Sequence, residues 1–122
     1  MKEPILPRQW HLYIVDLNPR IGTKPGKHRP CLAIQPNPFN EAGLLSTMLV
    51  PLTTRIISDV DETFPLRVRI PKGCCGLEKA SDLLIDQMLA WDNELFKQEL
   101  GKIPEDLQEK VKEAIREFLD LD

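Results

Sequence analysis

Residues 10–35 read WHLYIVDLNPRIGTKPGKHRPCLAIQ, two strand-like segments on either side of a loop rich in glycine and proline. The first segment, Trp10–Leu17, is rich in branched and aromatic residues, which favour strands, and an Asn-Pro dipeptide ends it. The second segment covers Pro30–Gln35. The intervening loop, Arg20–His28, holds two glycines and a proline, so we expect its backbone amides to be free to meet a ligand.

Three more strands are predicted downstream of these two segments. Thr47–Leu52 and Leu83–Met88 are short apolar runs, and Pro51 suggests that the first of them ends there or lies at a sheet edge. In Leu66–Ile70, apolar residues alternate with Arg67 and Arg69, which predicts a strand with one apolar and one basic face.

The last third of the chain predicts helices. Asp92 is suited to cap a short helix that ends before Gly101, and Pro104 is suited to begin a final helix with an apolar stripe. The predicted strands come first along the chain and the predicted helices come last, which indicates an α+β fold. We expect an antiparallel sheet that is closed or half-closed into a small barrel, with helices packed at one end.

The composition is that of one globular domain. The chain has 122 residues, 42% of them apolar and 29% charged, which suits a domain with a real core. No apolar run approaches the ~20 residues of a membrane span, and the first ten residues lack the apolar core of a signal peptide. We therefore expect a single domain over residues 1–122, located in the cytoplasm and not in a membrane.

The cysteines leave two interpretations open. Cys74 and Cys75 are adjacent, the total of three is odd, and there is no CxxC pair, so a zinc site is not expected. The adjacent pair is either two small apolar side chains of the core or a redox-active pair.

The charge is unevenly distributed along the chain. The net charge is −3, but ten acidic and five basic residues lie from Asp92 onward, which leaves a surplus of two positive charges before it. No acidic residue occurs between Leu17 and Asn40, a stretch that contains Arg20, Lys24, Lys27 and Arg29. Such a basic loop is either a local phosphate-binding site or an ordinary solvated loop.

Three segments together have a specific order. They are GTKPGKHRP at Gly22–Pro30, VPLTT at Val50–Thr54 and SDLLIDQ at Ser81–Gln87. With the flanking DLNP motif, this order resembles the MazF/PemK (Kid) family of toxin endoribonucleases, and the resemblance extends over nearly the whole chain.

The resemblance implies an SH3-like β-barrel that assembles as a homodimer. It also implies cleavage of single-stranded mRNA at short sequences, without a metal or other cofactor, in a groove shared by both subunits. A cognate antitoxin would neutralise the enzyme by occupying that groove, and the toxin–antitoxin complex would be DNA-binding.

Three residues are candidates for catalysis. Arg29 can stabilise charge on the phosphate, because a guanidinium offers paired donors and stays charged. Thr53 matches the active threonine of the family, and its hydroxyl can donate to a phosphate oxygen. Asp86 matches an aspartate proposed as the base, and on a buried apolar strand its pKa would be raised, which would suit that role. Each has a structural alternative: a loop brace, an ordinary strand-end threonine and a carboxylate that binds loop amides.

Further residues are candidates for holding the RNA. His28 adjoins Arg29 and titrates near neutral pH, so it can also serve as an acid. His11, by contrast, is expected to be a satisfied histidine of the core or its rim. The RNA-binding candidates are Gly22, Thr23, Lys24, Lys27, His28, Arg67 and Arg69, for which a solvated surface is the alternative.

The chain also departs from the family pattern. Two arginines that relatives place near the Asp-Gln motif are Leu84 and Leu89 here, which puts binding strength in doubt more than the fold. Three rival functions follow: an idle relative that only binds RNA or antitoxin, a gyrase poison on the same barrel, and an SH3-like interaction module. The gyrase poisons carry a tryptophan near the chain end, where this chain reads EFLDLD, and the low aromatic content disfavours the interaction module.

Overall fold

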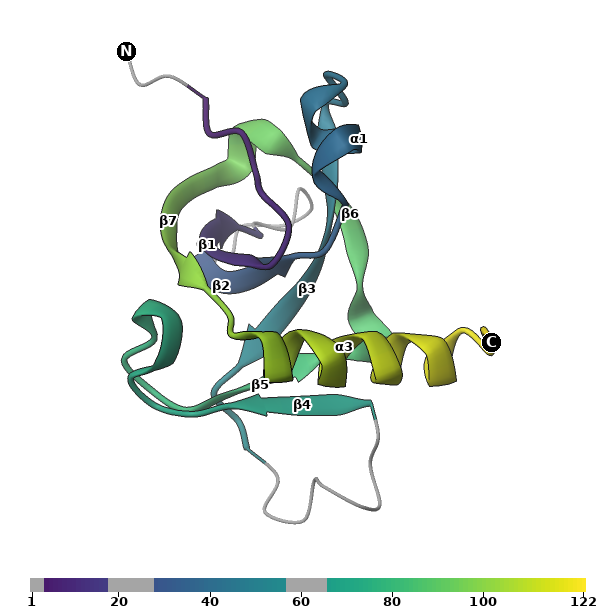
Figure 1. The fold of residues 1–122 in the computed structure, drawn as a ribbon. Coiled ribbons are helices and arrows are strands. Elements are labelled where there is room, and N and C mark those ends of the chain that lie inside the picture. Colours follow the sequence, from purple (N-terminus) through teal and green to yellow (C-terminus); the bar gives the residue numbers. More distant parts are fainter. Residues whose placement is uncertain (1–3, 18–27, 57–65) are drawn as a thin grey trace, which may run out of the picture.

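The structure is a computed structural model, and it describes residues 4–17, 28–56 and 66–122. Figure 1 shows the fold, with its elements coloured along the sequence. The strands are β1 (His11–Asp16), β2 (His28–Ala33), β3 (Ser46–Thr53), β4 (Arg67–Ile70), β5 (Ser81–Leu84), β6 (Leu89–Asp92) and β7 (Phe96–Lys102). The helices are α1 (Asn37–Glu41) and α3 (Glu105–Phe118), with 3₁₀ turns η1 (Cys74–Gly76), η2 (Ile85–Gln87) and η3 (Asn93–Leu95).

The described strands form a seven-stranded antiparallel sheet. Its order is β4-β5-β3-β2-β1-β7, and β6 also pairs with β3. Figure 1 shows β7 curving round β1 on one side and β6 standing on the other, so that five strands encircle a common interior. The fold is therefore α+β and barrel-like, as predicted, although the sheet is not fully closed.

Two apolar clusters lie on the two faces of the sheet. The inner cluster, within the barrel, contains Tyr13, Val15, Cys31, Ala33, Leu49 and Phe96. The outer cluster lies between the sheet and α3 and includes Leu12, Leu32, Val50, Leu83 and Val111. Residues alternate between the two clusters along β1 and β2 because successive side chains of a strand point to opposite faces.

The C-terminal helix is confirmed, and the helix predicted after Asp92 is wrong. Pro104 precedes α3, whose buried residues are Leu107, Val111 and Ala114. The Asp92 carboxylate does cap a turn, because it accepts from the backbone N–H of Glu94 at 2.9 Å, but that turn is only η3. The chain then continues as β7, which pairs with β1. Pairing with a distant strand, and not the local capping signal, therefore determines the secondary structure of this segment.

The apolar run Leu83–Met88 is not one strand. Residues Ser81–Leu84 form β5, the turn η2 follows, and β6 begins at Leu89. The break lies where β3 exchanges β6 for β5 as its neighbour. The short helix α1 lies in the segment Pro36–Gly43, which connects β2 to β3.

Cys74 and Cys75 are disulfide-bonded to each other in η1, half-buried against the outer cluster. The turn η1 packs against β7, and glycine is required on both sides of this contact. A Cβ at Gly76 would lie 2.8 Å from the carbonyl oxygen of Leu100, and one at Gly101 would lie 2.9 Å from that of Cys75. In the described ranges, no helix is both long and apolar enough to cross a membrane.

Candidate active site

The candidate site lies where β3 changes its strand partners. The pairing of β2 with β3 runs over Ala33↔Leu49, Leu32↔Val50 and Cys31↔Pro51. Beyond Pro51, β3 pairs with β5 through Leu52↔Leu83 and Thr53↔Asp82. We call this branch point the β2/β3 fork, with residues 29–30 on the β2 side and residues 52–54 on the β3 side.

Prolines explain why the fork lies at this point. Pro51 belongs to the last β2–β3 pair, and Pro30 is the residue of β2 immediately beyond that pair. Proline has no backbone N–H, so neither residue can donate a hydrogen bond to a strand ladder. The expectation that the strand ends at Pro51 or lies at a sheet edge is wrong, because β3 continues to Thr53 and lies between β2 and β5. The proline instead marks the end of the pairing between β2 and β3.

Arg29 and Thr53 stand on opposite sides of the fork. Each lies two residues beyond the last β2–β3 pair, so they occupy equivalent positions on the two sides of the fork, and both are half-buried. Alternation puts Arg29 on the same face as Cys31 and Thr53 on the same face as Leu49, which is the inner face of the barrel. The two main catalytic candidates thus lie on the same face of the sheet, at the end where the fork opens.

Cys31 lies two residues from Arg29 on the same strand, and its thiol donates to the Arg29 carbonyl at 3.6 Å. Burial raises the pKa of the Cys31 thiol to about 12, and the positive charge of Arg29 opposes this shift. Cys31 itself is fully buried, and it has the character of a core residue and not of a nucleophile.

Asp82 is a site residue that the sequence reasoning missed. It is fully buried and is the strand partner of Thr53. Arg69 donates to it from Nε to Oδ1 at 2.8 Å, and Arg67 Nη1 lies 3.8 Å from Oδ2. A buried carboxylate needs such partners, and two arginines on one face of β4 were the available signal that a carboxylate faces them.

These contacts change the interpretation of Arg67 and Arg69. Both were expected to extend an RNA track or to be solvated, but both reach Asp82, and Arg67 also donates to the carbonyl of Arg55 at 3.2 Å. The Arg69 side chain is still 39% exposed. Arg69 can therefore contact a ligand while it holds Asp82, whereas Arg67, at 19%, is mainly structural.

Asp86 does not lie on a buried strand. It belongs to η2, next to β3, and its side chain is exposed. The expectation of an apolar environment for this carboxyl group is therefore wrong. Its exposure leaves it accessible to a ligand, however, and only three residues lie between it and Asp82, the strand partner of Thr53.

The remaining predicted residues fall into three groups. His28 is exposed at the start of β2, with its Nε2 3.8 Å from Oδ2 of Asp16. His11 is paired with Glu99 at 2.6 Å, which confirms the expectation of a satisfied histidine. Gly22, Thr23, Lys24 and Lys27 lie outside the described residues.

The two leucines that replace family arginines fill space in the core. Leu84 is 6% exposed, and Leu89 packs against the inner cluster. Within the described ranges, no three His, Cys, Asp or Glu side chains are grouped so that they could hold a metal ion.

Comparison with known proteins agrees with the sequence resemblance. Residues 8–119 match the family described as PemK-like, MazF-like toxin of type II toxin-antitoxin system. Endoribonuclease MazF6 of Mycobacterium tuberculosis is 26% identical over 110 residues, which cover 90% of this chain and 94% of the relative. Endoribonuclease EndoA of Bacillus subtilis is 28% identical over 105 residues, which cover 86% and 87% of the two chains.

A solved structure shows the same fold. The crystal structure of MazE-MazF (Form-III) from Deinococcus radiodurans superposes with a TM-score of 0.77 at 22% sequence identity. The match covers 97% of this chain and 100% of that chain. The two chains therefore share the same fold, a barrel with a C-terminal helix.

Substitutions of the two aspartates next to the site should differ in their effect on stability. Asp82→Asn should lower the free energy of unfolding by about 2 kcal/mol or more, because it leaves Arg67 and Arg69 without their buried anionic partner. Solvent screens part of this interaction, since Arg69 is partly exposed. Asp86→Asn changes an exposed residue and should stay within about 0.5 kcal/mol of the wild type. Urea denaturation measures both, and equal midpoints for Asp82→Asn and wild type would contradict the ion-pair assignment.

Proposed function

Since the chain belongs to the PemK-like, MazF-like toxins of type II toxin-antitoxin systems, we propose that it is an endoribonuclease that cuts single-stranded mRNA in the cytoplasm. The observation that carries the proposal is that Arg29 and Thr53 each lie two residues beyond the last β2–β3 pair, on the two sides of the β2/β3 fork. The endoribonuclease relatives add weight, because they align over most of both chains.

We propose that cleavage uses the ribose 2′-hydroxyl next to the cut phosphate as the nucleophile. The 2′-oxygen attacks phosphorus, the bond to the 5′-oxygen of the next nucleotide breaks, and the products are a 2′,3′-cyclic phosphate and a 5′-hydroxyl. Arg29 stabilises the negative charge that builds up on the phosphate oxygens, and the Thr53 hydroxyl donates to one of them. This route requires proton transfer and charge stabilisation but no metal.

Two groups are assigned to the proton transfers. Asp86 takes the proton from the 2′-hydroxyl, and its exposure on η2 lets a substrate reach it. His28, which precedes Arg29 in the sequence and is exposed at the start of β2, gives a proton to the departing 5′-oxygen. The basic loop that includes Gly22, Thr23, Lys24 and Lys27, together with the partly exposed Arg69, holds the flanking phosphates, while Arg67 mainly holds Asp82.

The proposed chemistry predicts activity in the presence of a chelator. The purified protein should cut single-stranded RNA in excess EDTA and should leave duplex RNA and DNA intact, because only unpaired RNA offers a free 2′-hydroxyl in a flexible backbone. Gel analysis of labelled RNA measures this. Activity that disappears in EDTA and returns with magnesium would contradict the mechanism.

Substitutions at the fork should abolish cleavage without unfolding the protein. Removing one charge-stabilising group typically costs about 100-fold or more in rate, so Arg29→Ala should lose nearly all activity and Thr53→Ala almost as much. Asp86→Asn should also be slow, while its urea midpoint stays that of the wild type. Lys110→Ala, on the exposed face of α3, is the control that should cut normally. Near-normal cleavage by folded Arg29→Ala would show that the site lies elsewhere.

We further propose that the active form is a homodimer that is neutralised by a cognate antitoxin. A chain with a net charge of −3 and a single basic loop offers few cations to a polyanion. Two loops that flank a shared groove double the phosphate contacts, while the acidic C-terminal helices stay outside. An acidic, unstructured antitoxin segment can occupy the same groove, since it would compete for the same cations.

The homodimer should be visible in solution. Light scattering at micromolar concentration should give about twice the chain mass of 14.0 kDa. RNA affinity should fall steeply with salt, with a slope of roughly −0.7 per phosphate contact on single strands. A monomer that cuts RNA at the full rate would contradict the shared groove, though not the role of Arg29.

A further inference from the structure

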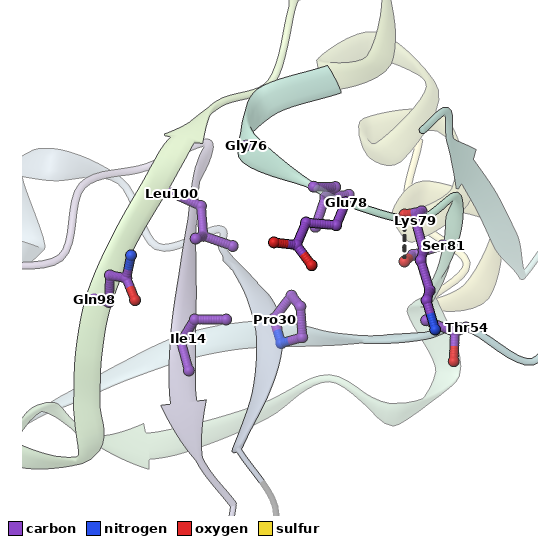
Figure 2. Close-up of a pocket in the computed structure, with 10 residues that line it drawn as sticks. Ile14, Pro30, Thr54, Gly76, Glu78, Lys79, Ser81, Gln98 and Leu100 are labelled. Carbon is purple, nitrogen blue, oxygen red and sulfur yellow. Dashed lines mark hydrogen bonds between the residues drawn. The ribbon is translucent and has the colours of Figure 1, made fainter. Parts of the chain in front are cut away.

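A cavity lies on the face of the sheet opposite Arg29 and Thr53. Its volume is about 420 Å³, within the range of small-molecule sites. Pro30 and Thr54, the residues that follow Arg29 and Thr53, both line it, so the two sides of the β2/β3 fork also form two walls of this cavity. Figure 2 shows these walls closed by the segment Gly76–Ser81 and by β7.

The floor of the cavity is apolar. Ile14, Pro30, Leu77 and Leu100 contribute to its lining, and Leu77 is buried. Apolar side chains gathered in one place can accept the face of a planar ring, because contact with them removes that face of the ring from water.

Polar groups surround this floor. Glu78, Lys79 and Gln98 all line the cavity, and Figure 2 shows the Glu78 carboxylate directed into it between Leu100 and Pro30. Within the described residues, no hydrogen bond or ion pair engages the side chain of Glu78 or of Gln98. The cavity thus offers a carboxylate that only accepts and an amide and an ammonium that donate.

The wall that carries Glu78 is held in place. Gly76 and Gly101 allow the turn before Glu78 to approach β7 more closely than any side chain would permit. At the other end of the segment, the Ser81 hydroxyl donates to the carbonyl of Lys79 at 3.2 Å. The carboxylate therefore projects from a fixed backbone, as a group that reads a base should.

We propose that this cavity is a specificity pocket for a guanine base within two nucleotides of the cleaved phosphate. Guanine presents two adjacent donors, N1–H and the N2 amine, which match the two oxygens of the Glu78 carboxylate. Its O6 accepts from Gln98 or Lys79. Uracil places a carbonyl where guanine has its amine, and that carbonyl would face the carboxylate.

The position of the cavity explains why the selected base is close to the cut. A phosphate held by Arg29 and Thr53 sits at the fork on one face of the sheet, and the cavity opens at the same fork on the other face. Because Pro30 and Thr54 are each one residue, about 3.8 Å between Cα atoms, from the catalytic candidates, a neighbouring base can be turned out of the strand to reach the pocket. The inference rests on the proposed function and adds a rule of substrate choice to it.

The test combines a change in the protein with a matching change in the RNA. Cut sites are first mapped on a random RNA pool, and the guanine nearest the cut is then replaced by inosine, which lacks only the N2 amine. Wild type should cut the inosine RNA about 10-fold more slowly, within the range for one paired hydrogen-bonding contact to a base. Glu78→Gln should cut the guanine RNA about as slowly, and inosine should then make no further difference, because both changes remove the same contact.

Glu113→Gln, an exposed carboxylate on α3, is the matched control and should respond to inosine as wild type does. The pocket assignment is overturned if cut sites show no guanine within two nucleotides, or if Glu78→Gln keeps the full response to inosine. Failure of the proposed function is a separate result, since wild type would then cut no RNA at all, and the base pocket would fall with it.

Discussion

The change of partners along β3 is the constraint on which the rest of the structure depends. This strand pairs with β6 over its first half, with β2 over Leu49–Pro51 and with β5 at its end. It therefore belongs to both parts of the sheet, and the two parts diverge at Pro51. Had Pro51 and Pro30 been residues with an N–H, the β2–β3 ladder could have continued and closed the fork. The same break that weakens the sheet thus creates the place where Arg29 and Thr53 face each other.

The fork also determines how charge is arranged. Register carries a row of side chains from Thr53 through Asp82 to Arg69 across three strands, and Arg29 stands on the other side of the fork from Thr53. Asp82 neutralises much of the charge of the β4 arginines, so Arg29 is the cation at the centre of the site, and Arg69 stays partly exposed at its side. The acidic C-terminal helix lies against the outer cluster, away from this face. A protein with a net negative charge can in this way present a local surface for a polyanion.

Local patterns in the sequence were sufficient for the elements whose periodicity matches their burial. The strands containing Tyr13, Leu32, Val50 and Val68, and the helix after Pro104, follow from apolar spacing and proline position. The segment after Asp92 could not be predicted in this way. Its residues, FKQELGK in β7, are acceptable in a helix, and only pairing with β1, some 85 residues earlier in the chain, makes them a strand.

The candidate site could be predicted only in part, because it too depends on contacts between segments that are distant in the sequence. Arg29 and Thr53 were identified because the motifs around them are specific, and strand register then places them together. Asp82 was missed because a lone charge in a short strand suggests a surface position, and its burial depends on arginines brought in by β4. The pocket around Glu78 is formed by β1, β7, the fork and the segment after η1, none of which is adjacent in sequence. Sequence alone carries no signal for such a meeting of distant segments.

The most direct measurement is a crystal structure of the protein with an RNA that carries one 2′-deoxy nucleotide at the cut site, so that it binds but cannot be cut. The account predicts that the phosphate next to this nucleotide lies within hydrogen-bonding distance of both the Arg29 guanidinium and the Thr53 hydroxyl, at the β2/β3 fork. A phosphate bound elsewhere, with Arg29 and Thr53 making no contact to the RNA, would contradict it.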